Sequence, residues 1–111
     1  MDVKISARAN KELDIMPQDL VIVIANLFEN AINGAEKAKS KDKTIDIYIK
    51  ESTQRLLIKM ENTCKDNLDF EESLYGEGIR SVIVTTTKYE GMYDFLAENG
   101  VFSAKISLNL S

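Results

Sequence analysis

The sequence predicts an α/β two-layer sandwich, in which a mixed, largely antiparallel sheet is covered on one face by helices. Three patterns indicate this fold class. Apolar residues recur at helical spacing from residue 20 to residue 38. The segments 45–49 and 56–60 alternate apolar and polar residues, as half-buried strands do. Residues 98–100 read Glu-Asn-Gly, a strong turn signal between two further strand-like segments.

The N-terminal third predicts an edge strand followed by a long helix. Residues 3–8 alternate apolar and polar side chains, which suggests the strand. The helix is expected from Pro17 to about Lys39. Proline suits a first helical turn because its missing N–H costs nothing there, and Asp19 complements the positive end of the helix dipole. The predicted core face of this helix consists of Leu20, Ile24, Leu27, Phe28, Ala31, Ala35 and Ala38.

The middle of the chain predicts a β-hairpin. Its first strand carries three isoleucines at alternating positions from Ile45, and its second carries Leu56, Ile58 and Met60. Residues 51–54 connect the two strands. The acidic, irregular segment from residue 65 to residue 75 is predicted to be a loop.

Residues 79–89 fit two interpretations. Their valines, isoleucines and threonines favour a strand, whereas the spacing of Ile79, Val82 and Ile83 fits a helical stripe. Propensity alone leans towards a strand, although Gly91 could terminate a helix. After the turn at 98–100, the last strand should present one apolar face, formed by Phe102, Ala104, Ile106 and Leu108.

Length and charge exclude several classes of protein. With 111 residues, 44% of them hydrophobic, the chain is large enough for one core and too small for two, so we expect a single domain over 1–111. A formal charge of -4 argues against a nucleic-acid surface. No apolar run reaches the roughly 18 residues needed to cross a bilayer, and the N-terminus has no signal-peptide character. We therefore expect no membrane insertion of this segment.

Cysteine and histidine usage narrows the chemistry. The single cysteine, Cys64, cannot form an internal disulfide, which favours a reducing compartment and a role as a small, semi-buried filler. The chain contains no histidine. Catalysis by Ser-His or Cys-His pairs is therefore excluded, as is any metal site built on histidine.

A polar stripe runs along the predicted first helix. Asn26, Asn30, Asn33 and Lys37 follow one another at spacings of four, three and four, with Glu29 beside them. Asparagine is a poor helix former because its amide competes for backbone hydrogen bonds. The stripe is either an ordinary solvated face or a polar site that requires these groups.

Three segments in chain order resemble a known family. They are Asn26-Leu27-Phe28-Glu29-Asn30-Ala31, Glu61-Asn62-Thr63, and Gly76-Glu77-Gly78-Ile79-Arg80-Ser81-Val82. Together they resemble the ATP-binding domain shared by gyrase, heat-shock chaperones, histidine kinases and mismatch-repair proteins, the GHKL superfamily. The first segment is similar to the N box and the third to the second glycine box. The likeness spans nearly the whole chain and is strongest to the catalytic domain of sensor histidine kinases that detect peptide quorum signals.

The resemblance implies a Bergerat-type ATP-binding fold with a helix over 79–89, and it implies a role for each polar residue of the stripe. Asn30 would bind Mg²⁺ through its amide oxygen, since this ion takes oxygen ligands and keeps waters and substrate phosphates. Asn26 and Asn33 would face the same phosphates without adding negative charge, and Lys37 could reach them as a point charge.

The glycines and the second segment have implied roles as well. Gly76 and Gly78 would let the backbone approach a polyphosphate, with Ile79 opening the helix whose dipole favours the anion. The first glycine box of the family begins with an Asp that binds the adenine amino group. Asn62 occupies that place here, and its oxygen could still accept that proton. The glycines that follow in the family are missing.

The candidate catalytic residues are Asn26 and Glu29. Gyrase-like members carry a carboxylate general base one turn before the magnesium Asn, where this chain has Asn26, which cannot take a proton from water. The neighbouring Glu29 could substitute. A site that holds ATP without activating water is what phosphotransfer requires.

The function implied is that of a histidine kinase catalytic domain in two-component signalling. It would bind Mg-ATP and present the γ-phosphate to a histidine on a separate dimerisation domain, with a response regulator downstream. The chain would be a cytoplasmic fragment of a longer, membrane-anchored sensor kinase, unable to autophosphorylate by itself. Two alternatives stay open: a degenerate nucleotide-sensing or protein-interaction module without phosphotransfer, which the altered first glycine box favours, and an anti-sigma-type serine kinase.

Overall fold

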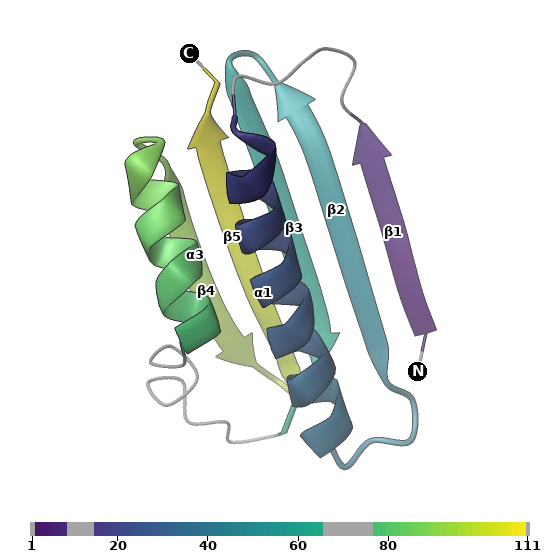
Figure 1. Cartoon of the computed structure of the whole chain (residues 1–111). Coiled ribbons are helices and arrows are strands. Elements are labelled where there is room, and N and C mark those ends of the chain that lie inside the picture. The colour runs from purple at the N-terminus through teal and green to yellow at the C-terminus, as the bar shows by residue number, and fades with distance from the viewer. Residues whose placement is uncertain (1, 9–14, 66–76, 111) are drawn as a thin grey trace.

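The protein is described here by a computed structural model, which covers residues 2–8, 15–65 and 77–110. The described residues form two layers, with a five-stranded sheet covered on one face by helices (Figure 1). This arrangement confirms the predicted fold class. The elements in chain order are β1 (Asp2–Arg8), α1 (Pro17–Lys37), β2 (Thr44–Ser52), β3 (Arg55–Thr63), α3 (Glu77–Lys88), β4 (Met92–Glu98) and β5 (Val101–Asn109).

The sheet is mixed, with the strand order β1-β2-β3-β5-β4. β1 pairs in parallel with β2, and the other neighbours are antiparallel. β1 lies at one edge, as its sequence predicts. The register places Ile47 opposite both Ile5 and Met60, so the apolar positions of neighbouring strands share the face towards the helices.

The core lies between that face and α1. All the apolar positions predicted for β3 and β5 are buried, and in β2 Ile45 and Ile47 are buried while Ile49 is partly buried against the same core. The Asn-Gly turn between β4 and β5 is also confirmed. Asn99 and Gly100 both have positive φ, at 52° and 77°, as a two-residue hairpin turn requires.

The buried stripe of α1 is shifted slightly from the predicted core face. The helix buries Val23, Leu27, Ala31 and Ala35, at a spacing of four residues. Three of the predicted positions, Leu20, Ile24 and Phe28, are only partly buried and pack along the flank of the core. Val23 was absent from the predicted face, although it lies one turn before Leu27 and is fully enclosed.

Residues 77–88 form the helix α3, so the strand-like propensity of its valines and threonines does not decide its structure. Ile79 and Val82 are buried against the core, and Thr86 is completely enclosed. Their spacing of three and four residues places them on one helical face. Burial of this face against α1 and the sheet outweighs the modest helix penalty of β-branched residues.

The end of α3 differs from the prediction that Gly91 terminates it. The residue with positive φ is Glu90, at 52°. The N–H of Glu90 bonds to Thr87 O at 2.9 Å and that of Gly91 to Thr86 O at 2.9 Å, the two bonds of a Schellman motif. Gly91 is needed for space instead, since a Cβ there would lie 2.0 Å from Ser107 O in β5.

Replacing Thr86 with valine should stabilise the domain by about 1 kcal/mol. Its hydroxyl is fully buried and has no hydrogen-bond partner among the described residues. Valine keeps the shape and removes the desolvated group. The midpoint of urea unfolding should rise with an unchanged slope, whereas the same change at the exposed Thr87, which bonds to Ile83 O, should not raise it. A lowered midpoint for Thr86→Val would mean that the hydroxyl is satisfied in solution.

Candidate functional site

α1 and α3 pack side by side and run in opposite directions. The N-terminal turn of α1 meets the C-terminal end of α3, where Asp19 contacts Lys88 and Tyr89. The middle of α1 meets the start of α3, where Asn26 lies against Gly78. The helices are therefore tied together at one end and border an open cleft at the other.

The contact that joins the two helix ends, called the tie below, is a buried carboxylate, that of Asp19, with two hydrogen-bond donors, Lys88 and Tyr89. Lys88 Nζ lies 2.8 Å from Asp19 Oδ2, and Tyr89 Oη donates to the same oxygen at 2.5 Å. The N–H of Met16 donates to Tyr89 Oη at 3.0 Å. The hydrogen bond from Lys88, followed by that from Tyr89, lowers the pKa of Asp19 below its usual range, and the bond to Asp19 raises the pKa of Lys88. No local sequence pattern predicts this contact, because it joins residues far apart in the chain.

This tie predicts a pH-dependent loss of stability in acid. Because the folded-state pKa of Asp19 is lowered, its contribution is present above the ordinary value of 3.8 and is lost as the pH falls through the folded value. Asp19→Asn should lower Tm at neutral pH by several degrees. The difference from the wild type should shrink below pH 3.8, whereas the exposed Asp46→Asn in β2 should have little effect. A difference that is independent of pH would contradict the ionic role.

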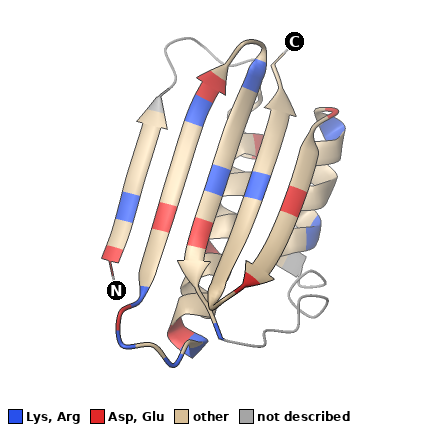
Figure 2. Ribbon diagram, turned by 180° about the vertical axis from the view of Figure 1, so that it is seen from behind, with Lys and Arg blue, Asp and Glu red and all other residues tan. Residues whose placement is uncertain are grey.

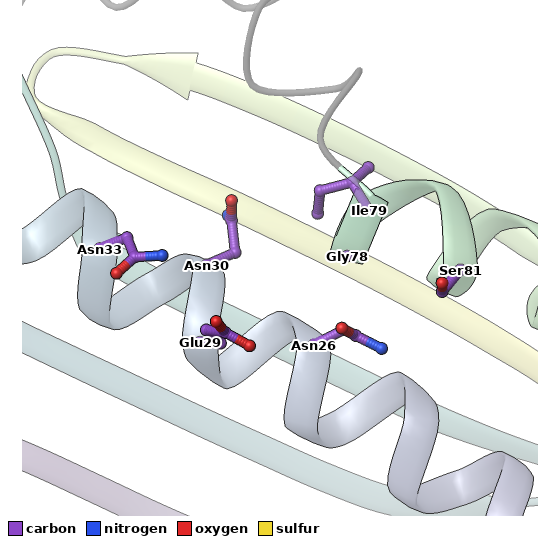
Figure 3. A pocket seen from close by; sticks show the side chains of 7 residues that line it. All are labelled: Asn26, Glu29, Asn30, Asn33, Gly78, Ile79 and Ser81. Atoms are coloured by element: carbon purple, nitrogen blue, oxygen red, sulfur yellow. The ribbon is translucent and has the colours of Figure 1, made fainter.

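The cleft has a volume of about 430 Å³ and a predominantly polar lining. Figure 3 shows the lining side chains, which come from successive turns of α1 and from the first turns of α3. α1 contributes three amides and one carboxylate, and α3 contributes a glycine, the edge of a core residue and a hydroxyl. The lining residues are Asn26, Glu29, Asn30, Asn33, Gly78, Ile79 and Ser81.

Asn26 has a defined orientation in the cleft. Its Nδ2 donates to Ile22 O, one turn earlier, at 2.7 Å. Its Oδ1 therefore faces Gly78, and a Cβ built on Gly78 would lie 3.1 Å from this oxygen. The glycine keeps the passage between the two helices open. Any larger side chain would press on the amide.

The start of α3 borders the cleft with backbone donors. The first N–H groups of a helix have no partner within it, and the helix dipole adds partial positive charge at the same end. Gly78 lies in this first turn, where the absence of a side chain lets another group approach the backbone. The Asn26 amide oxygen on α1 thus lies against the first turn of α3. This combination suits an anion that carries a metal ion.

Six of the predicted site residues line this cleft: Asn26, Glu29, Asn30, Asn33, Gly78 and Ile79. Lys37 is exposed at the last residue of α1 and does not line it. Ile79 does not open the helix, which begins at Glu77, and most of its side chain lies in the core. Ser81 was missed, although it follows Gly78 by three residues and so faces the same way on a helix.

Asn62 lies deeper than the cleft. It is 3% exposed, its Nδ2 donates to Thr63 O at 2.9 Å, and this nitrogen would lie 2.7 Å from a Cβ at Gly34 of α1. The glycine therefore makes room for the amide beneath the helix. Gly76 and the predicted loop, apart from Lys65, lie outside the described residues.

The described residues contain no cluster of three or more Asp, Glu, Cys or His side chains that could hold a metal ion. The side-chain oxygens that the described part of the cleft offers an ion are those of its three amides, the Glu29 carboxylate and the Ser81 hydroxyl. Within the same ranges, no helix has the length and apolar character to cross a membrane.

Comparison with known proteins identifies the family. The family described as the GHKL domain matches residues 15–109, which is most of the chain. The chain belongs to the GHKL family. Among curated proteins, none matches this GHKL domain.

Several solved histidine kinase structures share its fold. The histidine kinase domain of the Erythrobacter litoralis blue-light activated histidine kinase has a TM-score of 0.77 at 12% identity over 98% of this chain and 51% of its own. The Acinetobacter baumannii histidine kinase AdeS gives 0.75 at 14% identity over 98% and 54%. The nucleotide-free catalytic domain of the histidine kinase ThkA gives 0.75 at 13% identity over 98% and 78%. The GHKL domain thus spans about half the length of the first two structures.

Proposed function

We propose that this GHKL domain binds Mg-ATP between α1 and α3 and presents the γ-phosphate to a histidine on a separate phosphoacceptor domain. The observation that carries the proposal is the cleft itself, in which three α1 amides face the glycine-containing N-terminus of α3. Its volume of about 430 Å³ is in the range of small-molecule sites. The fold shared with histidine kinase catalytic domains supports the same reading.

The α3 side of the cleft suits phosphate groups. Its first backbone N–H groups would donate to phosphate oxygens, and the space kept by Gly78 would allow close approach. Ser81 adds a hydroxyl on the same side. When bound, ATP supplies the phosphoryl group that is transferred.

The α1 side suits a magnesium ion. Asn30 would bind the ion through its amide oxygen, and Asn33 would contact the phosphates or the waters of the ion. These neutral oxygens match the hard-ligand preference of Mg²⁺, which commonly keeps several waters and binds through substrate phosphates. Lys37 lies one turn beyond Asn33, where it could reach a phosphate only by its long side chain.

Among the described residues that line the cleft, Glu29 is the one candidate for a base in hydrolysis. The Asn26 amide is held by Ile22 O and cannot take a proton from water. Glu29 is the only carboxylate among the lining residues and is the residue that would act as a base if one is used. A site that positions ATP while leaving water inactive favours transfer to a histidine. Because this chain contains no histidine, the acceptor must lie outside it.

We also propose that Asn62 recognises the adenine base. Asn62→Leu should lower affinity for adenine nucleotides by about 1–3 kcal/mol, the cost of leaving a buried polar partner unpaired. Binding of ATP and GTP should be compared by titration, with Tm as a check that the variant folds. Equal affinity of the wild type for ATP and GTP would argue against recognition at this position.

The wider setting is proposed from the family resemblance. The domain would be the cytoplasmic catalytic part of a membrane-anchored sensor kinase of the peptide quorum-sensing type, acting on a response regulator. Residues 1–111 would form one fragment of that longer protein. Its coverage of about half of two kinase structures is consistent with this setting.

Calorimetric titration with a non-hydrolysable ATP analogue tests the proposed function. We expect binding that Mg²⁺ strengthens. Binding that is indifferent to Mg²⁺ would favour a degenerate nucleotide-sensing module instead. The absence of any binding would overturn the nucleotide site.

A further inference from the structure

Apart from the cleft between α1 and α3, the sheet face opposite the helices also offers a surface for a partner. Figure 2 views this face, and no described element packs on it. A hollow of about 450 Å³ lies over β3 and β5, with a lining that is mainly apolar. Its walls include Tyr48, Leu57 and Met92, which are 45%, 37% and 63% exposed. The hollow does not share a residue with the cleft between the helices.

The sheet register explains why the surface is hollow there. Leu57 on β3 and Met92 on β4 both lie directly opposite Ser107 on β5. A small side chain therefore stands between two large ones on the same face. The resulting depression fits an inserted apolar side chain better than it fits a flat partner surface.

The residues around this hollow carry more positive than negative charge, although the chain is acidic as a whole. Lys59 and Lys105 are direct cross-strand partners, and like charges in that position destabilise a sheet. Lys50 is the partner of Leu57, and Arg55 Nη1 lies 3.4 Å from Ser107 Oγ. Of these four cations only Lys59 has an ion pair within the described residues, with Glu61 at 3.2 Å. Among the described residues, the one acid that lines the hollow is Asp94, which lies directly opposite Lys105 on the neighbouring strand β4.

We propose that this face docks an acidic amphipathic helix of a partner protein. An apolar side chain of that helix would enter the hollow, and carboxylates beside it would neutralise Lys59, Lys105 and their neighbours. An uncovered sheet face is also a surface on which a helix packs well, as α1 does on the other side. This inference is independent of the proposed nucleotide site, which lies on the opposite face.

The test uses a designed amphipathic peptide of about 18 residues with leucine on one face and glutamate on the other. The control is a peptide of the same pattern with lysine in place of glutamate. Two-dimensional amide NMR of the chain should show shifts at Leu57, Met92, Lys105 and Ser107 with the acidic peptide, weakening as salt rises. The basic peptide should leave these amides unchanged.

Variants separate the two halves of the proposal. Lys59→Glu with Lys105→Glu should weaken acidic-peptide binding at least about tenfold. Lys4→Glu with Lys41→Glu changes the net charge equally at residues that do not line the hollow, and it should alter affinity less than about twofold. Leu57→Ser should abolish the shifts while leaving Tm and nucleotide titration unchanged.

Four outcomes would overturn the proposal. The first two are the absence of amide shifts at the hollow and equal shifts from both peptides. The third is binding of phosphatidylglycerol vesicles without binding of the acidic peptide. The fourth is a dimer of the chain, detected by sedimentation, that forms through this face. Because the nucleotide titration reports on the other face, failure of this proposal leaves the proposed function standing.

Discussion

Gly91→Ala is expected to destabilise the domain by about 3 kcal/mol or more, the upper end for an overpacked site. A Cβ at this position would lie 2.0 Å from Ser107 O and 3.1 Å from Thr86 Cγ2. The carbonyl belongs to β5, which has strands on both sides, so it cannot move away without disturbing the sheet. The same residue bonds through its N–H to Thr86 O and leads directly into β4.

Urea unfolding measures this effect, and Gly100→Ala is the matched control. Gly100 has a φ of 77° in the half-buried turn between β4 and β5, so alanine there should cost about 1 kcal/mol through the backbone alone. If Gly91→Ala lowers the free energy of unfolding no more than Gly100→Ala does, Gly91 does not lie as close to Ser107 O in solution as it does in the structure.

Asn30→Ala is expected to weaken nucleotide binding in the presence of Mg²⁺ by at least about tenfold, an effect of the size seen when groups that support a metal site are removed. Without Mg²⁺ the affinity should change little, because the lost oxygen serves the ion. The fold should persist, since Asn30 lines a cleft rather than the core. Tm should stay constant or rise slightly, as alanine is the better helix former by a few tenths of a kcal/mol.

Glu36→Ala is the control for this variant. It lies on the same helix, is exposed and does not line the cleft. It should leave Mg²⁺-dependent binding unchanged. An unaltered Mg²⁺ dependence in Asn30→Ala would end the assignment of this residue to the metal.

The strands could be predicted well because the signals for a strand or a tight turn lie within a few consecutive residues. Alternation in β2 and β3 and the turn at 98–100 each depend on a few consecutive residues, and the structure confirms them. α3 could not be predicted from propensity, because its helix depends on burying Ile79, Val82 and Thr86 against segments distant in sequence. The spacing of its apolar residues fitted a helix while propensity favoured a strand, and the family resemblance decided for the helix.

The candidate site shows the same division. The Asn stripe predicted which flank of α1 is polar. The structure places its three asparagines, together with the adjacent Glu29, in the lining of the cleft. The position of Asn62 under Gly34 and the tie between Asp19 and Lys88 depend on how elements pack, which no spacing within one element records. For the same reason Lys37 was expected at the site but lies at the exposed helix end.

The central claim is that a nucleotide binds between α1 and α3. Backbone amide NMR with Mg²⁺ and a non-hydrolysable ATP analogue tests it most directly, because each helix has its own signals. We predict that shifts concentrate at residues 26–33 and 78–81 and that they decrease in Asn30→Ala. Shifts that are absent from both helices, or that gather on the open face of β3 and β5, would contradict the account.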